Sequence, residues 1–245
     1  MAKFKFKEID EEGEDTLKSV GEAKLFNKWM FSEVEPFNQG KIFEIGSGVG
    51  NISEFFLDGG YDITLSDIRE NYCGYLEDKF SKYSNLSAIV KMDAERPDFD
   101  EAYKEHIGKY DSVFSLNVVE HIADDQLAVV NATKLLKRGG QLTILVPAYQ
   151  TLFNSIDKGL DHYRRYTKKS LTSLLRGADL QIEHKQYFNF MGIPGWFAAG
   201  MVTRQRTVGG GQMKLYNLGV PVFKVLDKML MKRVGLSVIA VGKKI

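Results

Sequence analysis

The sequence predicts an α/β fold in which a mostly parallel sheet is covered by helices on both faces. Seven short apolar runs of strand length alternate with helical patterns along the chain. The chain has 245 residues, 44% of them hydrophobic and 27% charged, and this size and balance suit one domain with a large core. The predicted strands are 41–45, 62–65, 86–92, 112–116, 141–146, 181–188 and 236–241.

Glycines predict where three of the intervening helices end. Apolar helical patterns run up to Gly59 and Gly60, to Gly139 and Gly140, and to Gly177. A glycine takes the left-handed conformation that ends a helix more readily than other residues do. Thr167 is the predicted N-cap of the third of these helices, because its hydroxyl can accept a hydrogen bond from a free N–H group of the first turn.

Two parts of the chain lie outside the strand and helix alternation. Residues 1–40 are predicted to form an acidic tail followed by one helix, and residues 41–245 to form the main domain. Within that domain, residues of about 190–234 separate the last two strands and contain three consecutive glycines at 209–211. Such a flexible break between two apolar stretches predicts a cap or lid.

The second half of this lid has an amphipathic helical pattern. Its apolar face is predicted to pack on the chain's own domain or on a second subunit. The alternative is that the helix lies on an anionic membrane, because lysines form a basic stripe beside the apolar face. The apolar residues are Val222, Val225, Leu226, Met229 and Leu230, and the lysines are Lys224, Lys228 and Lys232.

Charge is distributed unevenly along the chain. Residues 1–130 contain 14 Lys and Arg against 27 Asp and Glu, whereas residues 131–245 contain 19 against 5. The basic second half suits an anionic acceptor or an anionic lipid surface. Attraction between the two halves of the fold remains the alternative.

The composition predicts a cytoplasmic protein without metal or disulfide bonds. No stretch approaches the roughly 20 uninterrupted apolar residues of a spanning helix, and the first residues do not resemble a secretory signal. Cys73 is the single cysteine and the four histidines are scattered, so no zinc-binding pattern is present in the sequence.

The segment 41–52 predicts a ligand site. An apolar strand runs into the pattern Glu-x-Gly-x-Gly-x-Gly and then into a helix; glycines there let the backbone approach a ligand closely. No Gly-Lys-Ser/Thr follows, which excludes a phosphate-binding Walker loop, and Asn51 stands where a dinucleotide fingerprint requires glycine. Glu44 would repel a pyrophosphate and suits a cationic ligand.

Two further acids end the next two predicted strands. Asp67 lies 21 residues after Gly46, where it could accept hydrogen bonds from both hydroxyls of a bound ribose. Asp93 ends the third strand at the same predicted sheet edge and is a candidate for contact with an adenine amino group.

These residues resemble the ordered motifs of class I S-adenosylmethionine-dependent methyltransferases, and the similarity continues through residues 110–122 and 135–147. The resemblance implies a Rossmann-like, doubly wound sheet with strand order 3-2-1-4-5-7-6 and an antiparallel last strand. It also implies S-adenosylmethionine as cofactor, with Asn117 and Val118 beside its methionine part. The expected cofactor residues are Glu44, Gly46, Ser47, Gly48, Gly50, Asp67, Ile68, Asp93, Ala94, Asn117 and Val118.

Residues 26–30 and 161–167 additionally resemble a bacterial subgroup of methyltransferases associated with glycosyltransferases. This resemblance suggests a saccharide or lipid-linked acceptor. Because S-adenosylmethionine is reactive, alignment of donor and acceptor is the main requirement, and a base helps if a hydroxyl is methylated.

His121 is the first candidate for that base, and its alternative role is to organise the loop after the fourth strand together with Glu120. His162 is the second candidate. Its neighbours Arg164 and Arg165 could clamp an anionic group, or could instead pair with Asp157 or Asp161. The predicted acceptor residues are Tyr163, Arg164, Arg165, Tyr187, Asn189 and Trp196.

The leading functional hypothesis is methylation of an oxygen atom on a small-molecule or lipid-linked acceptor. The alternatives are methylation of nitrogen or carbon, including a quinone-like ring, a noncatalytic cofactor-binding module, and an oxidoreductase. A nucleic-acid substrate is disfavoured because the sequence after the fourth strand, Asn117-Val-Val-Glu, lacks the Asn/Asp-Pro-Pro-aromatic pattern. The chain is expected to be a monomer or homodimer.

Overall fold

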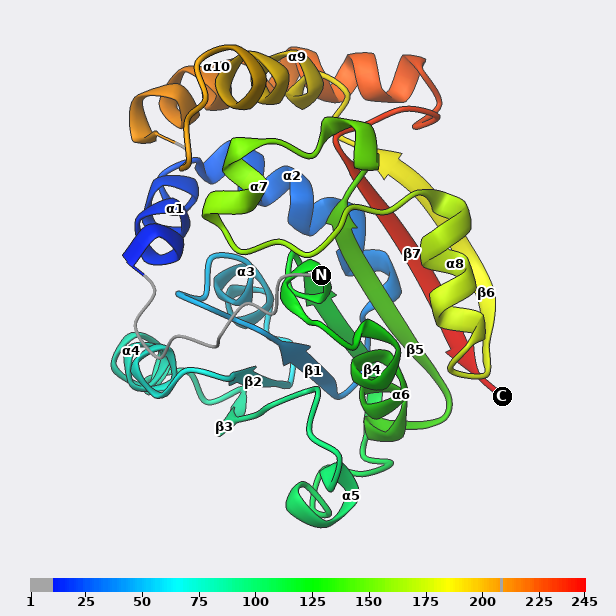
Figure 1. Cartoon of the computed structure of the whole chain (residues 1–245). Helices are drawn as coiled ribbons and strands as arrows, with labels where there is room; N and C mark the ends of the chain where they lie inside the picture. The colour runs from blue at the N-terminus through cyan, green and yellow to red at the C-terminus, as the bar shows by residue number, and fades with distance from the viewer. Residues whose placement is uncertain (1–10, 208) are drawn as a thin grey trace.

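The computed structural model describes residues 11–207 and 209–245. A seven-stranded sheet with strand order β3-β2-β1-β4-β5-β7-β6 forms its centre (Figure 1). The five strands β3, β2, β1, β4 and β5 pair in parallel, and β7 pairs antiparallel with both β5 and β6. The predicted fold class and strand order are therefore confirmed. The strands are β1 (Ile42–Ile45), β2 (Ile63–Asp67), β3 (Leu86–Lys91), β4 (Tyr110–Leu116), β5 (Leu136–Pro147), β6 (Leu180–Phe188) and β7 (Ser237–Lys244).

Helices cover both faces of this sheet and bury two separate cores. On one face, α6 and α8 pack on side chains such as Phe43 and Val113. On the other face, α2, α3 and α4 enclose a core that contains Trp29, Phe56 and Phe114. The helices of these layers are α2 (Lys24–Val34), α3 (Ser53–Asp58), α4 (Glu70–Phe80), α5 (Phe99–Ala102), α6 (Asp125–Leu135) and α8 (Lys168–Arg176).

The segment before β1 forms two helices rather than the one predicted. These are α1 (Glu11–Gly21) and α2, separated at residues 22–23 and followed by the short 3-10 helix η1 (Glu35–Phe37). Residues 1–10, the beginning of the predicted tail, lie outside the described residues. α1 extends to the glycine-rich turn after β1, where the Asn51 side chain donates a hydrogen bond to Leu17 O at 2.9 Å.

Left-handed glycines were predicted to end three helices, and this prediction is confirmed at one position and wrong at two. Gly60 is left-handed with φ of 78°, as predicted. Gly177 has φ of −63°, and Asp179 adopts the left-handed conformation instead. Gly139 is left-handed but lies inside β5, because α6 already ends at Leu135. Thr167 caps α8 as predicted, and its hydroxyl accepts a hydrogen bond from Ser170 N.

The predicted lid lies between β6 and β7 and consists of α9 (Gly192–Phe197), the π-helix η4 (Ala198–Val202) and α10 (Gly210–Met229). β6 is parallel to β5 because both pair antiparallel with β7. The lid therefore begins at the edge of the sheet where the parallel strands end, and it crosses the top of the molecule in Figure 1. Among the described residues, no helix is long and apolar enough to cross a bilayer.

Only one side of α10 packs on the domain, and it is not the predicted side. Val220 and Asp227 are buried, and Tyr216 and Phe223 pack against the same core as Trp29. The predicted apolar face points to solvent, with Val222 62%, Val225 57% and Met229 72% exposed. The prediction that this face packs on the domain is therefore wrong.

Candidate active site

A glycine-rich turn joins β1 to α3 at the carboxyl edge of the sheet. Gly46, Gly48 and Gly50 have φ of 76°, 54° and 72°, values that an L side chain adopts only with strain. The N–H groups of Gly46 and Ser47 both donate to Ser66 O, at 2.9 and 2.8 Å. The turn is thereby fastened to the end of β2.

Two side chains approach this turn closely, and at Gly46 the space for a side chain is already filled. A Cβ atom at Gly46 would lie 2.3 Å from Val118 Cγ2, and one at Gly48 would lie 3.1 Å from Leu17 Cδ1. Val118 follows β4 and Leu17 belongs to α1. The turn is thus enclosed between β4 and the N-terminal helix.

Glu44 lies directly beneath the turn, with 4% of its surface exposed. Burial raises the pKa of this carboxyl to about 7, although hydrogen bonds from the Ser53 and Ser47 hydroxyls oppose the shift and the Asp67 charge adds to it. Ser53 Oγ donates to the carboxylate. The interacting groups are hydroxyls and another carboxyl, so a cationic ligand would favour the ionised form.

Asp67 ends β2 and holds the turn directly. Its Oδ2 accepts a hydrogen bond from Gly48 N and its Oδ1 accepts one from Arg69 N, both at 3.0 Å. Burial raises the pKa of Asp67, and these two N–H donors oppose the rise. The predicted ribose contact therefore belongs to a residue that also positions the glycine backbone.

The remaining predicted cofactor residues follow β2, β3 and β4 at the same edge. Asp93 and Ala94 come after β3, and Asp93 Oδ1 accepts a hydrogen bond from Glu95 N at 2.9 Å. Asn117 follows β4, is exposed, and has φ of 56°. Ile68 is half-buried after β2. The parallel pairing of β3, β2, β1 and β4 brings all these positions to one edge.

A second group of polar side chains lies beyond β4. Glu120 has no exposed surface, and neither of its carboxyl oxygens has a hydrogen-bond partner in the described part of the chain. Burial raises the pKa of Glu120 to about 8; the Arg165 charge opposes this shift, and the Asp157 charge adds to it. An unpaired buried carboxylate is unfavourable, so this residue is not explained by packing.

His121 and His162 lie next to Glu120. Their ring centroids are 4.5 Å apart in an edge-to-face arrangement, and one ligand atom from each of the three residues lies within 4.8 Å of the others. His121 keeps an exposed surface, whereas His162 is 4% exposed. Desolvation lowers the pKa of both rings, His162 and Arg69 lower that of His121 further, and Asp157 opposes the shift of His162.

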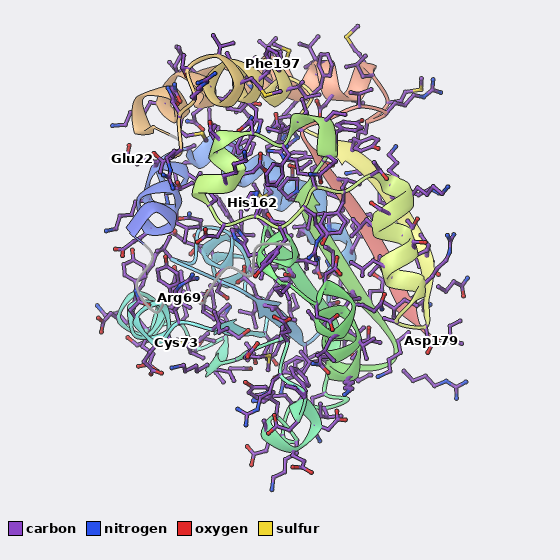
Figure 2. The ribbon with its side chains drawn as sticks, in the orientation of Figure 1. Glu22, Arg69, Cys73, His162, Asp179 and Phe197 are labelled. Atoms are coloured by element: carbon purple, nitrogen blue, oxygen red, sulfur yellow. The ribbon has the colours of Figure 1, made fainter. Side chains whose placement is uncertain are left out.

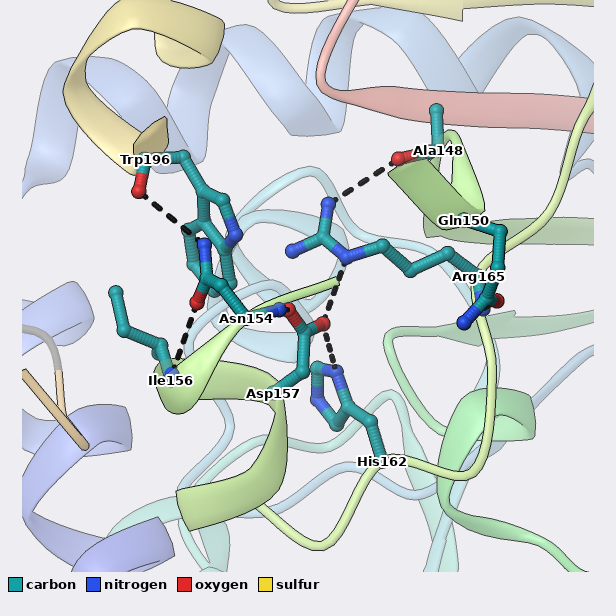
Figure 3. A network of polar contacts seen from close by, with 8 residues as sticks. All are labelled: Ala148, Gln150, Asn154, Ile156, Asp157, His162, Arg165 and Trp196. Carbon is teal, nitrogen blue, oxygen red and sulfur yellow. Dashed lines mark hydrogen bonds and ion pairs between the residues drawn. The ribbon is translucent and has the colours of Figure 1, made fainter. Parts of the chain in front are cut away.

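A buried network of hydrogen bonds and ion pairs holds the His162 ring through its Nδ1 atom (Figure 3). Asp157 Oδ1 accepts hydrogen bonds from His162 Nδ1 at 2.9 Å and from Arg165 Nε at 2.7 Å, and Asp157 Oδ2 accepts one from Asn154 N at 2.9 Å. Burial alone would raise the pKa of Asp157, but His162 and Arg165 hold it below its usual value. The Arg165 guanidinium also lies 4.5 Å from the Trp196 ring centroid, which links the network to the lid.

The structure divides the predicted acceptor residues into groups. Arg165 and Trp196 belong to the network around His162. Arg165 pairs with Asp157, which is one of the predicted alternatives, and this pair is buried. Arg164 points elsewhere: it donates to Ile122 O and Ala123 O at 3.0 and 2.8 Å and pairs with Asp125 at 2.9 Å. Tyr163 lies beside it, with the Arg164 guanidinium 5.4 Å from its ring centroid.

Tyr187 and Asn189 lie at the end of β6, where the lid begins. Tyr187 is 9% exposed and stacks on Tyr149 at 4.9 Å. Asn189 has φ of 69°, and its Oδ1 accepts hydrogen bonds from Gly192 N and the Tyr216 hydroxyl. Asn189 therefore fixes the start of the lid.

The sequence did not predict Asp157 as the support of His162, because a lone Asp five residues before a His carries no distinctive signal.

Comparison with known proteins agrees with this arrangement. Residues 43–142 match the model of the family described as "Methyltransferase domain". A ubiquinone biosynthesis O-methyltransferase of Xanthomonas oryzae pv. oryzae is 24% identical over 156 residues, which cover 58% of this chain and 63% of that protein. The chain thus aligns with less than two thirds of that relative.

Solved structures share the fold. A SAM-dependent methyltransferase from Archaeoglobus fulgidus superposes with a TM-score of 0.57 at 18% identity, covering 89% of this chain and 94% of that one. Phosphoethanolamine N-methyltransferase 2 of Haemonchus contortus, solved in complex with S-adenosyl-L-methionine, gives 0.58 at 16% identity, covering 89% of this chain and 52% of that one.

Residues 43–142 are thus similar to a methyltransferase domain, and the chain shares its fold with solved S-adenosylmethionine-dependent methyltransferases. These similarities agree with the predicted class I methyltransferase and with S-adenosylmethionine as its cofactor. The roles of individual residues and the acceptor remain proposals.

Proposed function

We propose that this protein transfers a methyl group from S-adenosylmethionine to an oxygen atom of a small-molecule acceptor. The observation that carries the proposal is the carboxyl edge of the sheet, where a glycine turn is flanked by Glu44 and Asp67. The cofactor combines an ammonium and a sulfonium with a nucleoside and has no phosphate. Two carboxylates beside a glycine turn fit that set of charges, and they fit a dinucleotide poorly.

In this proposal Asp67 binds the ribose hydroxyls, Asp93 contacts the adenine amino group, and Glu44 favours the positive charge of the methionine part. Asn117 and Val118 border the methionine side. The bound cofactor supplies a methyl group activated by its sulfonium. The protein aligns the acceptor with that group and excludes water.

The Glu120, His121 and His162 cluster supports oxygen methylation in particular. A hydroxyl must lose its proton when it is methylated, and a neutral imidazole accepts a proton. Both histidine pKa values lie below the usual range, so the rings are neutral at pH 7. His121 is the first candidate because it is exposed, and His162 is the second. The similarity to a ubiquinone biosynthesis O-methyltransferase of Xanthomonas also favours an oxygen acceptor, including one on a quinone-like ring.

Binding and turnover test the proposal separately. Calorimetry with S-adenosylmethionine, S-adenosylhomocysteine and NAD is expected to show binding of the first two; binding of NAD alone would contradict the cofactor assignment. Release of S-adenosylhomocysteine should then be measured with phosphorylated sugars, lipid-linked sugars and phenols. Binding without release for any acceptor, with amines included, would favour the noncatalytic alternative.

The exposed side of α10 favours a lipid-linked acceptor. Leu215, Leu218, Val222, Val225 and Met229 form a continuous stripe at intervals of three and four residues, and each is at least 57% exposed. Phe197 of α9 is also exposed on the outside of the lid (Figure 2). A stripe of this kind on a monomeric surface marks an interaction site.

The charges around the stripe indicate which surface it contacts. Residues 190–234 contain seven Lys and Arg and one acid, Asp227, and Asp227 is only 2% exposed. An anionic membrane complements such a surface. A second copy of the same face would place cations against cations, so we propose peripheral contact with anionic lipid rather than a homodimer through this stripe.

Vesicle flotation tests this contact. The protein is expected to float with vesicles that contain phosphatidylglycerol and to stay in solution with pure phosphatidylcholine. The double variant Leu218→Gln and Val225→Gln should lose flotation, whereas Tyr75→Ser, which removes an exposed aromatic ring on α4, should retain it. A concentration-dependent dimer that the double variant abolishes, without flotation of the wild type, would contradict the proposal.

A further inference from the structure

Glu120 is the starting point of a further inference, because a fully buried carboxyl group without a partner is costly to maintain. Both of its oxygens are enclosed and unpaired among the described residues. Protonation does not remove the problem, because a buried O–H donor and a carbonyl oxygen would then both lack partners. A group bound at this point would satisfy them.

The neighbours of Glu120 are metal ligands by type and placement. One possible ligand atom from each of Glu120, His121 and His162 lies within 4.8 Å of the other two. Two imidazole nitrogens and one carboxylate oxygen form a ligand set that binds divalent transition metals while leaving coordination positions open.

His162 is oriented as a metal-binding histidine usually is. A carboxylate only accepts hydrogen bonds, so the contact with Asp157 Oδ1 places the ring proton on His162 Nδ1. The neutral ring then carries its free lone pair on Nε2. A carboxylate behind a histidine commonly fixes the tautomer and strengthens the ligand in this way. Asp157 itself is held by Arg165 Nε and Asn154 N.

The local charges also suit a cation. Asp157 and Arg165 form a buried ion pair at 2.7 Å whose charges cancel. The pair therefore adds no net positive charge that would repel a cation. A divalent ion bound at Glu120 would take the place of its carboxyl proton and provide the partner that both oxygens lack.

We propose that Glu120, His121 and His162 bind one divalent transition-metal cation of the zinc class. The sequence alone predicts no metal site, because the three ligands come from residues 120–121 and 162, separated by α6, β5 and α7 (Ser155–Gly159). If the proposed oxygen methylation is also right, the ion would lower the pKa of an acceptor hydroxyl, and the histidines would act as ligands rather than as bases.

Cobalt provides a direct spectroscopic test that does not depend on activity. Full-length protein, stripped of metal with a chelator and dialysed, should be titrated with Co²⁺ while its visible absorption is recorded. One ion per chain is expected to produce d–d bands typical of nitrogen and oxygen ligands, and Zn²⁺ should displace it. Absence of any saturable spectrum would overturn the proposal.

Variants assign the ligands. His121→Ala, which changes an exposed ring, and Glu120→Gln, which keeps the side-chain shape, are each expected to weaken Co²⁺ binding by at least roughly 100-fold, because loss of a residue that only supports a ligand already costs about 10- to 100-fold. His184→Ala is the matched control, because His184 is a half-buried histidine on β6. Equal affinity of all three variants would overturn the assignment. Circular dichroism establishes that each variant is folded.

Calorimetry with S-adenosylmethionine separates this inference from the proposed function. Cofactor binding without Co²⁺ binding would reject the metal site alone and leave His121 as a base. Co²⁺ binding without cofactor binding would retain the metal site and reject the proposed methyl transfer. Full turnover in the presence of a chelator, by protein that contains no metal, would contradict a role for the ion in the reaction.

Discussion

Val118 Cγ2 occupies the space that a side chain at Gly46 would need. The distance from an ideal Cβ on Gly46 would be 2.3 Å, far shorter than a van der Waals contact. Val118 follows β4 and Gly46 follows β1, and these strands are neighbours in the sheet. The close approach sets how near the glycine turn lies to the segment that is expected to border the methionine part of the cofactor.

Replacing Gly46 by alanine should therefore displace the turn. We expect Gly46→Ala to abolish measurable binding of S-adenosylmethionine and to destabilise the fold by about 2 to 4 kcal/mol, through backbone strain and overpacking. Gly60→Ala is the matched control: its φ is 78°, but no atom lies within 4 Å of the new Cβ. Calorimetry and urea unfolding measure both effects, and equal loss in the two variants would exclude the Val118 contact as the cause.

Asp67 should contribute to cofactor binding through its charge as well as its hydrogen bonds. Asp67→Asn retains an oxygen that can accept from Gly48 N and removes the charge. We expect roughly a 10- to 100-fold weaker affinity for S-adenosylmethionine, since hydrogen bonds to charged groups contribute about 1.5 to 3 kcal/mol. Asp78→Asn on the exposed side of α4 should leave affinity unchanged. Unchanged affinity in Asp67→Asn would remove Asp67 from the site.

Glu44 should make the stability of the cofactor-free protein depend on pH. Its pKa rises from 4.5 to about 7 on folding. Between these values the folded protein holds a proton that the unfolded chain releases, so stability present below pH 4.5 is lost as pH rises toward 7. The loss is on the order of 3 kcal/mol.

Glu44→Gln removes this titration and keeps a partner for the Ser53 hydroxyl. We expect the variant to be more stable than the wild type at pH 8, with the difference shrinking toward pH 4.5. Thermal unfolding across this range provides the measurement, with the exposed Glu77→Gln as control. A difference that does not vary with pH would contradict burial as the cause. The same variant should bind S-adenosylmethionine more weakly, because it lacks the negative charge.

Asp157 should contribute to the free energy of unfolding of the domain. Asp157→Ala leaves the Arg165 guanidinium buried without its ion-pair partner, which is expected to cost about 3 to 5 kcal/mol in urea unfolding. Lys158→Ala, on the exposed side of the same helix, should change stability by less than about 0.5 kcal/mol. If Arg165→Met is combined with Asp157→Ala, the loss should be smaller than the sum of the single losses. An additive result would show that the pair is not coupled.

Most of the sheet was predictable because buried parallel strands are recognisable as short apolar runs. The segment 41–45 and the later runs correspond to observed strands, and the resemblance of the motifs provided their order. The glycine turn and the position of Asp67 at the end of β2 were also predictable, because three glycines at fixed spacing after an apolar run indicate a tight turn. Helix ends were less predictable: Asp179 adopts the left-handed conformation expected of Gly177.

The side of α10 that is buried could not be read from its sequence. The helix carries apolar side chains around much of its circumference, so the pattern of Val222, Val225 and Met229 resembles a core-facing stripe. The packing of Val220 and Phe223 beside Trp29, and the hydrogen bonds from Asn189 N and Phe190 N to Asp227, decide the orientation. The packing contacts with Trp29 join residues almost 200 positions apart, and the hydrogen bonds to Asp227 join residues 38 and 37 positions apart.

The sequence by itself determined the fold class, the strand order through its motifs, and the position of the glycine turn after β1, because these depend on local patterns and fixed spacings. Only the tertiary structure decided that Glu120, His121 and His162 meet, that Asp157 supports His162, and that a stripe of α10 faces solvent. Contacts of this kind depend on how separate elements are packed against one another, and that distance information is not contained in any one stretch of sequence.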